Sequence, residues 1–158
     1  MTACRAYDRC QTDQAEKSAE EAAMENLIVP AKTENLDRVT MFVDERLEAY
    51  ECPVPIQMQI ELAIEEIFVN IAHYAYHPLS GEAEIRCEVL QEPLRVVIQF
   101  LDNGKPFDPL AGGEVDTSKE AILGRVGGLG IHLVKTTMDD VRYAYENGKN
   151  TLTILKKL

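Results

Sequence analysis

Four polar residues of the segment 60–77 are spaced so that they could act together. At about 100° per residue of an α-helix, Glu66, Asn70, His73 and His77 fall in one narrow row, with apolar residues on both sides. A carboxylate can act as a general base, and an amide oxygen is a ligand that suits Mg²⁺. The spacing makes Glu66 and Asn70 candidates for these tasks, although the two could instead satisfy each other or cap a neighbouring backbone group. The two histidines are more typical of structural residues than of metal ligands.

A second motif, DNGKPFDP at 102–109, stands where a predicted strand ends and a long loop begins. A simple turn would explain it. The carboxylate of Asp102 could also accept a hydrogen bond from an amino group such as that of adenine, and Gly104 would let a ring approach the backbone closely.

A third motif, GRVGGLGI at 124–131, runs directly into an amphipathic helical pattern. Free backbone N–H groups and the helix dipole at such a start favour an anion, so the motif fits a phosphate cradle as well as a structural glycine cluster. It is not a Walker P-loop, because no Gly-Lys-Ser/Thr follows. The dinucleotide fingerprint also fails, because Leu133 stands where its last glycine would be.

The elements that must position these motifs follow from hydrophobic periodicity and turn residues. Thr33 is the expected N-cap of the first helix, Pro53 and Pro55 open the second, and Asn147-Gly148 forms a hairpin turn. Helices are expected over 33–50, 53–76 and 127–138, and strands over 27–31, 84–90, 94–102, 140–145 and 150–157. About three helices on a mostly antiparallel five-stranded sheet predict an α+β fold, a two-layer α/β sandwich.

Composition limits the class of protein. The chain has 158 residues, 46% of them hydrophobic and 27% charged, which suits one globular domain. A net charge of -11 argues against direct binding of nucleic acid. The sequence shows neither a membrane span nor a signal peptide, and its four scattered cysteines fit reduced thiols, so we expect a cytoplasmic protein. Residues 1–23 read as a loose or marginally helical extension, and 24–158 as the folded domain.

The motifs stand in one order: ELAIEEIFVNIAHYAY, DNGKPFDP, GGLGIHLVKTTMDDVRYAY and then NGKNTLTILKKL. Together they resemble the GHKL superfamily of the Bergerat ATP-binding fold, which includes gyrase-type ATPases and histidine-kinase catalytic domains. The particular form of the boxes looks most like the anti-sigma-factor serine kinases. The resemblance covers about residues 27–158.

The resemblance implies a role for individual residues. Glu66 would be the general base, and Asn70 the ligand of Mg²⁺. Asp102 would recognise the adenine of ATP, with Gly104 admitting the base and Thr151 supporting the contact. The remaining implied residues bind phosphates, either through backbone N–H groups or from an ATP lid at about 105–126: Gly128, Leu129 and Gly130 in the first group, and Lys105, Lys119 and Arg125 in the second.

The function implied is that of a Mg-ATP-dependent serine/threonine protein kinase. Its substrate would be a STAS-domain anti-sigma-factor antagonist, with capture of a sigma factor as a second activity and a homodimer through the first helix left open. No phosphoacceptor hairpin or transducer domain is recognisable beside the ATP domain, so a sensor histidine kinase or a gyrase-like ATPase is not expected. Two alternatives remain: a non-catalytic ATP-dependent binding module, and a structural domain that does not bind ATP.

Overall fold

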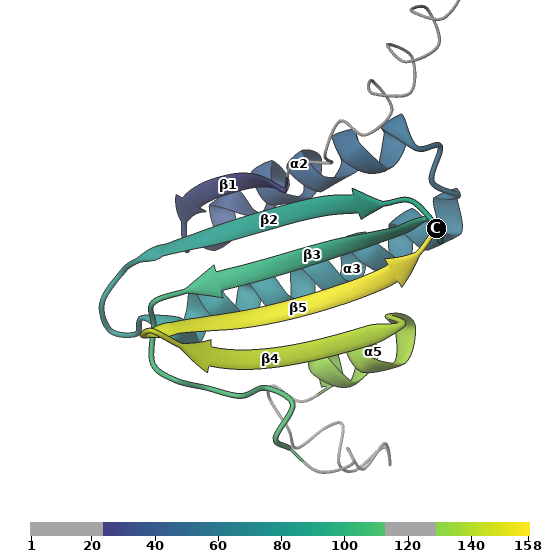
Figure 1. Cartoon of the computed structure of the whole chain (residues 1–158). Helices are drawn as coiled ribbons and strands as arrows, with labels where there is room; N and C mark the ends of the chain where they lie inside the picture. The colour runs from purple at the N-terminus through teal and green to yellow at the C-terminus, as the bar shows by residue number, and fades with distance from the viewer. Residues whose placement is uncertain (1–23, 113–128) are drawn as a thin grey trace, which may run out of the picture.

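The structure, a computed structural model, describes residues 24–112 and 129–158 as a sheet with helices on one of its faces (Figure 1). The strands are β1 (Glu25–Pro30), β2 (Glu82–Leu90), β3 (Arg95–Asp102), β4 (Asp140–Glu146) and β5 (Lys149–Lys157). They follow the order β1-β2-β3-β5-β4, and every neighbouring pair is antiparallel. The predicted extension 1–23 lies outside the described residues, as do Lys119, Arg125 and Gly128.

Alternation along the strands sets which face of the sheet is covered. In β2, every second side chain from Ala83 to Val89 is buried, and the same rhythm continues in β3 and β5. At the β4–β5 hairpin, Asn147 and Gly148 both have positive φ, at 52° and 75°, which is the geometry of a type I′ turn. The predicted hairpin is therefore confirmed.

The helices are α2 (Leu36–Ala49), α3 (Val54–Asn70) and α5 (Leu129–Thr137). α3 lies behind the middle of the sheet, with α2 behind the β1 edge and α5 behind β4 (Figure 1). Four side chains of α3 are almost fully buried against the sheet: Ile60, Ile64, Ile67 and Phe68. α3 is therefore the centre of the helical layer, because it contacts both other helices.

The expected α+β two-layer sandwich is confirmed, with corrections at two helix ends. Thr33 is not the N-cap of the first helix: it begins a short 3₁₀ turn, η1 (Thr33–Asn35), and α2 starts at Leu36. Asn35 precedes α2 but donates its side-chain amide to the carbonyl of Pro30, 2.9 Å away, instead of capping the helix. The second helix does continue past Asn70, but as a π-helical turn, η2 (Ile71–Ala75).

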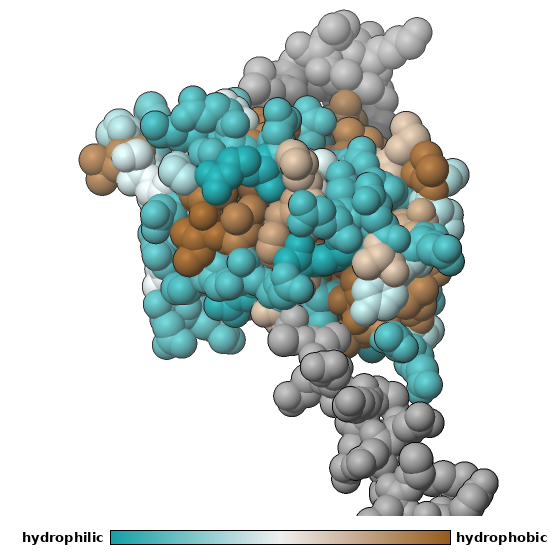
Figure 2. All heavy atoms as spheres, turned by 90° about the horizontal axis from the view of Figure 1, so that it is seen from above, coloured by the Kyte–Doolittle hydropathy of each residue, from teal (hydrophilic) through white to brown (hydrophobic). Residues whose placement is uncertain are grey.

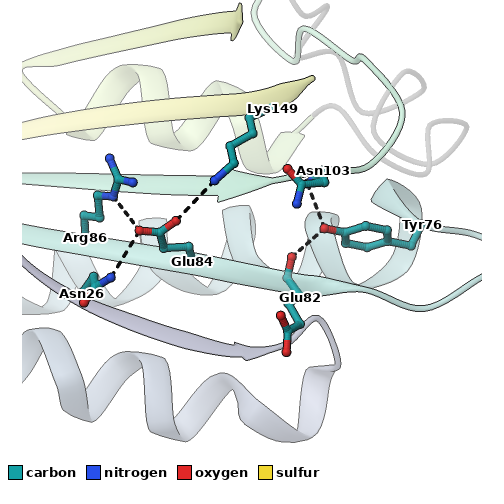
Figure 3. A network of polar contacts seen from close by, with 7 residues as sticks. All are labelled: Asn26, Tyr76, Glu82, Glu84, Arg86, Asn103 and Lys149. Atoms are coloured by element: carbon teal, nitrogen blue, oxygen red, sulfur yellow. Dashed lines mark hydrogen bonds and ion pairs between the residues drawn. The ribbon is translucent and has the colours of Figure 1, made fainter. Parts of the chain in front are cut away.

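Polar side chains on the open face of the sheet join several strands (Figure 3). Glu84 accepts hydrogen bonds from Asn26 at 3.3 Å and from Arg86 at 2.7 Å, and lies 3.8 Å from the amino group of Lys149. The bond from Arg86 is the main reason that the pKa of Glu84 lies below its usual range. This network connects β1, β2 and β5 across the face that the helices leave open.

Two further observations concern the remaining surface and the thiols. None of the helices in 24–112 or 129–158 is long and apolar enough to cross a membrane. Seen from above, the molecule is largely hydrophilic with separate apolar patches (Figure 2).

Cys52 and Cys87 are free thiols, as expected, and burial raises the pKa of Cys87 to about 12. Cys4 and Cys10 lie outside the described residues.

The central position of α3 gives a first prediction. Phe68 is 0% exposed at the centre of the core, so Phe68→Ala leaves a cavity between α3 and the sheet. We expect it to lower the free energy of unfolding by about 3–5 kcal/mol in urea titrations. Leu79→Ala is the control, since Leu79 is 81% exposed; an equal loss in both variants would contradict the placement of α3.

Candidate functional site

The carboxylate of Glu66 lies against the first turn of α5. Glu66 is half-buried, and a Cβ built on Gly130 would stand only 1.8 Å from its Oε2 atom. A side chain at position 130 would have to push the carboxylate of Glu66 out of its observed position. The contact brings the predicted base to the glycine-rich start of a helix, where free N–H groups and the helix dipole favour an anion.

Asn70 is the last residue of α3 and is also half-buried. No hydrogen bond joins the side chains of Glu66 and Asn70, so the mutual satisfaction that the sequence left open is not observed. The π-helical turn that follows widens the helix at this point, a feature that often marks functional sites. His73 and His77 are exposed, so the sheltered row ends at Asn70.

Asn70 can contribute one oxygen to a divalent cation. Within the part of the chain that the structure describes, no group of three His, Cys, Asp or Glu side chains could hold a metal ion by itself. Mg²⁺ commonly takes only one or two protein ligands and completes its shell with nucleotide phosphates and water. The half-buried amide of Asn70, one helical turn from Glu66, fits that arrangement.

Asp102 ends β3 as a buried carboxylate, only 7% exposed. Its Oδ1 atom accepts hydrogen bonds from the backbone N–H of Gly104 at 2.8 Å and from the side-chain amide of Asn150 at 2.9 Å. Both bonds fall on the same oxygen, and no hydrogen bond from the described residues reaches Oδ2. One oxygen is therefore held in place while the other can accept a hydrogen bond from a ligand.

Asn150 is the residue that the sequence did not reveal. It is 6% exposed, directly opposite Asp102 in the β3–β5 register. Its amide nitrogen donates to Asp102 and to the carbonyl of Lys105 at 3.0 Å. Its oxygen accepts from the hydroxyl of Tyr143 at 2.6 Å and from the N–H of Phe107 at 3.2 Å. Asn150 thus fixes both Asp102 and the loop that follows it.

A second set of contacts attaches that loop to the end of the π-helical turn. A Cβ on Gly104 would lie 2.3 Å from the carbonyl oxygen of Ala75, and the N–H of Lys105 donates to that same oxygen at 2.9 Å. The hydroxyl of Tyr76 accepts from the N–H of Asn103 and donates to the carbonyl of Glu82 (Figure 3). Burial raises the pKa of Tyr76, so this phenol stays a donor at neutral pH.

The other predicted site residues within the described chain form no hydrogen bond with the carboxylate of Asp102. The amino group of Lys105 donates to the carbonyl of His77 at 2.9 Å, so in this structure it stabilises the end of the helical segment. Thr151 pairs with Leu101 and, by strand alternation, points to the opposite face of the sheet from Asn150. The structure therefore does not bring Thr151 to Asp102. Leu129 and Gly130 are the first described residues of α5.

The fold and the site define a class of protein. It is a two-layer α+β sandwich in which α3 carries Glu66 and Asn70, Glu66 lies against the start of α5, and the π-helical turn after α3 contacts the loop that follows the buried carboxylate of Asp102. The chain belongs to the histidine kinase-like ATPase domain family, whose model matches residues 29–156. This confirms the predicted membership of the GHKL superfamily, and ATP is the nucleotide of this family of domains.

Individual relatives agree with this assignment. The serine-protein kinase RsbW of Listeria monocytogenes is 31% identical over 93 residues, 56% of this chain and 59% of that protein. The enzyme of the same name from Bacillus cereus is 31% identical over 97 residues, 59% of either chain. The chain thus spans about three fifths of the length of these relatives. A chain of the SiaB–SiaC complex of Pseudomonas aeruginosa shares the fold over 93% of this chain and 97% of its own, with a TM-score of 0.58 and 13% identity.

The two glycine contacts predict opposite results for the same substitution. Gly130→Ala meets only the movable end of Glu66 and adds helix propensity, so we expect stability to stay equal or to rise by up to about 1 kcal/mol. Gly104→Ala meets the backbone carbonyl of Ala75, and we expect it to cost about 1–3 kcal/mol. Thermal unfolding of both variants measures the difference. Equal destabilisation would show that Glu66 is not free to move away from position 130.

The Asn150 network gives a further prediction. Asn150→Ala leaves several buried groups without their partners, so we expect a loss of about 3 kcal/mol in the free energy of unfolding. Tyr143→Phe removes one of the four hydrogen bonds and should cost about 1 kcal/mol. Urea titrations of both variants provide the comparison. If Asn150→Ala cost no more than Tyr143→Phe, the amide would not be organising the loop.

Proposed function

We propose that this protein is a Mg-ATP-dependent serine/threonine protein kinase of the anti-sigma-factor type. The observation that supports the proposal is the close approach of Glu66 to Gly130, because in the proposed site the phosphates of a bound nucleotide would lie at this start of α5. The naming of the two bacterial relatives as serine-protein kinases supports the same reaction. The expected protein substrate is a STAS-domain anti-sigma-factor antagonist.

The site residues suggest how ATP is oriented. The exocyclic amino group of adenine would donate to Oδ2 of Asp102, whose other oxygen is already fixed by Asn150. Gly104 would leave room for the ring beside the backbone. The phosphates would then extend to the start of α5, where Leu129 and Gly130 present backbone N–H groups. Asp102 and Glu66 thus mark the two ends of the nucleotide.

The transfer needs one base and a leaving group. The oxygen of a serine or threonine hydroxyl attacks the γ-phosphorus while Glu66 accepts the hydroxyl proton. A bond forms between that oxygen and phosphorus, the bond from phosphorus to the β–γ bridging oxygen breaks, and ADP leaves with the bonding electrons. Mg²⁺, held in part by the amide oxygen of Asn70, would supply neutralisation of the phosphate charge.

The remaining parts of the proposal concern partners and place. A chain of the SiaB–SiaC complex has the same fold, which supports the proposal that this protein acts by binding another protein. We include capture of a sigma factor as a second activity, a phosphate contact of Lys105 and Arg125, and a cytoplasmic location, since sigma factors act there. A homodimer through the first helix, here α2, also belongs to this proposal.

The decisive test compares two neighbouring carboxylates of α3. Glu66→Gln should keep ATP affinity within about twofold but slow transfer of labelled phosphate to a STAS-domain substrate by about 100-fold or more. Glu65→Gln is the matched control, because Glu65 is exposed one position away, and it should transfer like the native protein. Transfer by Glu66→Gln at the native rate would remove Glu66 from the mechanism. Complex formation by the native protein without transfer would identify a non-catalytic binding module.

A further inference from the structure

An open groove of about 600 Å³ lies between α2 and α3. α3 separates it from the nucleotide site, because Glu66 contacts α5 on the other side of this helix. The groove is lined on α2 by Leu36, Asp37, Thr40 and Met41, and on α3 by Met58, Glu61, Leu62 and Glu65. None of these residues has a task in the proposed transfer.

The floor of the groove is apolar and exposed. Met41 is 61% exposed, Met58 62% and Leu62 39%, whereas Val43 and Ile64 on the core-facing sides of the same helices are 0% exposed. Contiguous exposed apolar surface rimmed by polar residues is typical of interaction sites. Methionine adapts its shape to a partner surface, since its side chain is unbranched and polarisable. The volume is sufficient for a few apolar side chains of a partner.

The rim of the groove is acidic on both helices. Asp37 stands on α2, with Glu61 and Glu65 opposite on α3, and no ion pair among residues 24–112 and 129–158 involves any of them. Asp44 lies further along α2 and outside the groove lining; its Oδ1 atom is buried without a hydrogen-bond partner from the described chain. Burial first, then the charge of Glu61, raises the pKa of Asp44. No ion pair among the described residues therefore neutralises the carboxylates of the rim.

Charge decides between the candidate occupants. A second copy of the chain in this groove would bring the same carboxylates against each other, which is unfavourable, so the homodimer proposed above would use another face of α2. We propose that the groove binds a basic amphipathic helix of a partner protein. Its apolar residues, spaced at i, i+3 and i+4, contact the two methionines and Leu62, and its lysines or arginines pair with the rim.

The test uses the full chain labelled with ¹³C at its methionine methyl groups. The probe is a ~18-residue amphipathic helical peptide with leucines on one face and lysines beside them. We expect the signals of Met41 and Met58 to shift on titration, and that of Met138, which is 6% exposed, to stay in place. Binding should weaken as salt is raised from 50 to 300 mM, because exposed charges are screened. A peptide with the same leucines but glutamates in place of lysines should not bind.

Matched variants make the outcome decisive. Glu65→Lys reverses one rim charge and should weaken the lysine peptide by about fivefold or more, whereas Glu45→Lys, exposed outside the groove, should change affinity less than about twofold. The proposal is overturned if Met41 and Met58 do not shift, if both peptides bind equally, or if both variants behave alike. Shifts that depend on protein concentration alone would identify a second copy as the occupant and overturn it too. These readouts need no ATP, so they stand apart from the kinase test.

Discussion

The site depends on how closely one helical segment, α3 with its π-helical turn, approaches two glycines. Its carboxylate Glu66 fills the space beside Gly130, and the carbonyl of Ala75 fills the space beside Gly104. Neither contact as observed has room for a β-carbon, and neither glycine has a positive φ, so the constraint is volume and not backbone freedom. It is strict at Gly104, where the obstacle is backbone, and can be relieved at Gly130 if the side chain of Glu66 moves. Because α3 is also the centre of the core, both ends of the candidate nucleotide site are held by the same packing that stabilises the fold.

The pair Asp102 and Asn150 shows how a carboxylate can be buried and still be available. Burial of a charged group is unfavourable unless hydrogen bonds replace those of water. Two such bonds converge on one oxygen of Asp102, and one of them comes from Asn150. The orientation of that amide is itself determined, because its nitrogen faces two oxygens that only accept and its oxygen faces the N–H of Phe107, so a flipped amide would oppose these three contacts and only the hydroxyl of Tyr143 could adapt. The resulting geometry leaves the second oxygen of Asp102 with a fixed direction.

The sequence predicted what depends on local pattern and missed what depends on register and helix geometry. Glu66 and Asn70 were selected as candidates because helical spacing places them in one sheltered row. The glycines were selected because they stand in motifs that resemble those of the family. The predicted sheltered row does not extend to His73, which is exposed. The reason is that a π-helical turn begins after Asn70, and a pattern with 3.6 residues per turn cannot reveal such a turn. Asn150 was missed because only the cross-strand register brings it opposite Asp102. Thr151 was chosen by resemblance, yet alternation along β5 directs it to the other face.

The distribution of charge explains how so acidic a chain can serve an anionic ligand and a basic partner at once. With a net charge of -11, the long-range field of the protein repels ATP, so nucleotide binding in the proposed site would rely on short-range donors: the N–H groups at the start of α5 and a cation held by Asn70. The same field attracts a basic segment, and at the α2–α3 groove it is reinforced by Asp37, Glu61 and Glu65. Because α3 separates the groove from the nucleotide site, a cationic partner can bind there without neutralising the carboxylate of Glu66. In the proposed arrangement the acidic surface would select the partner, and the start of α5 would select the nucleotide.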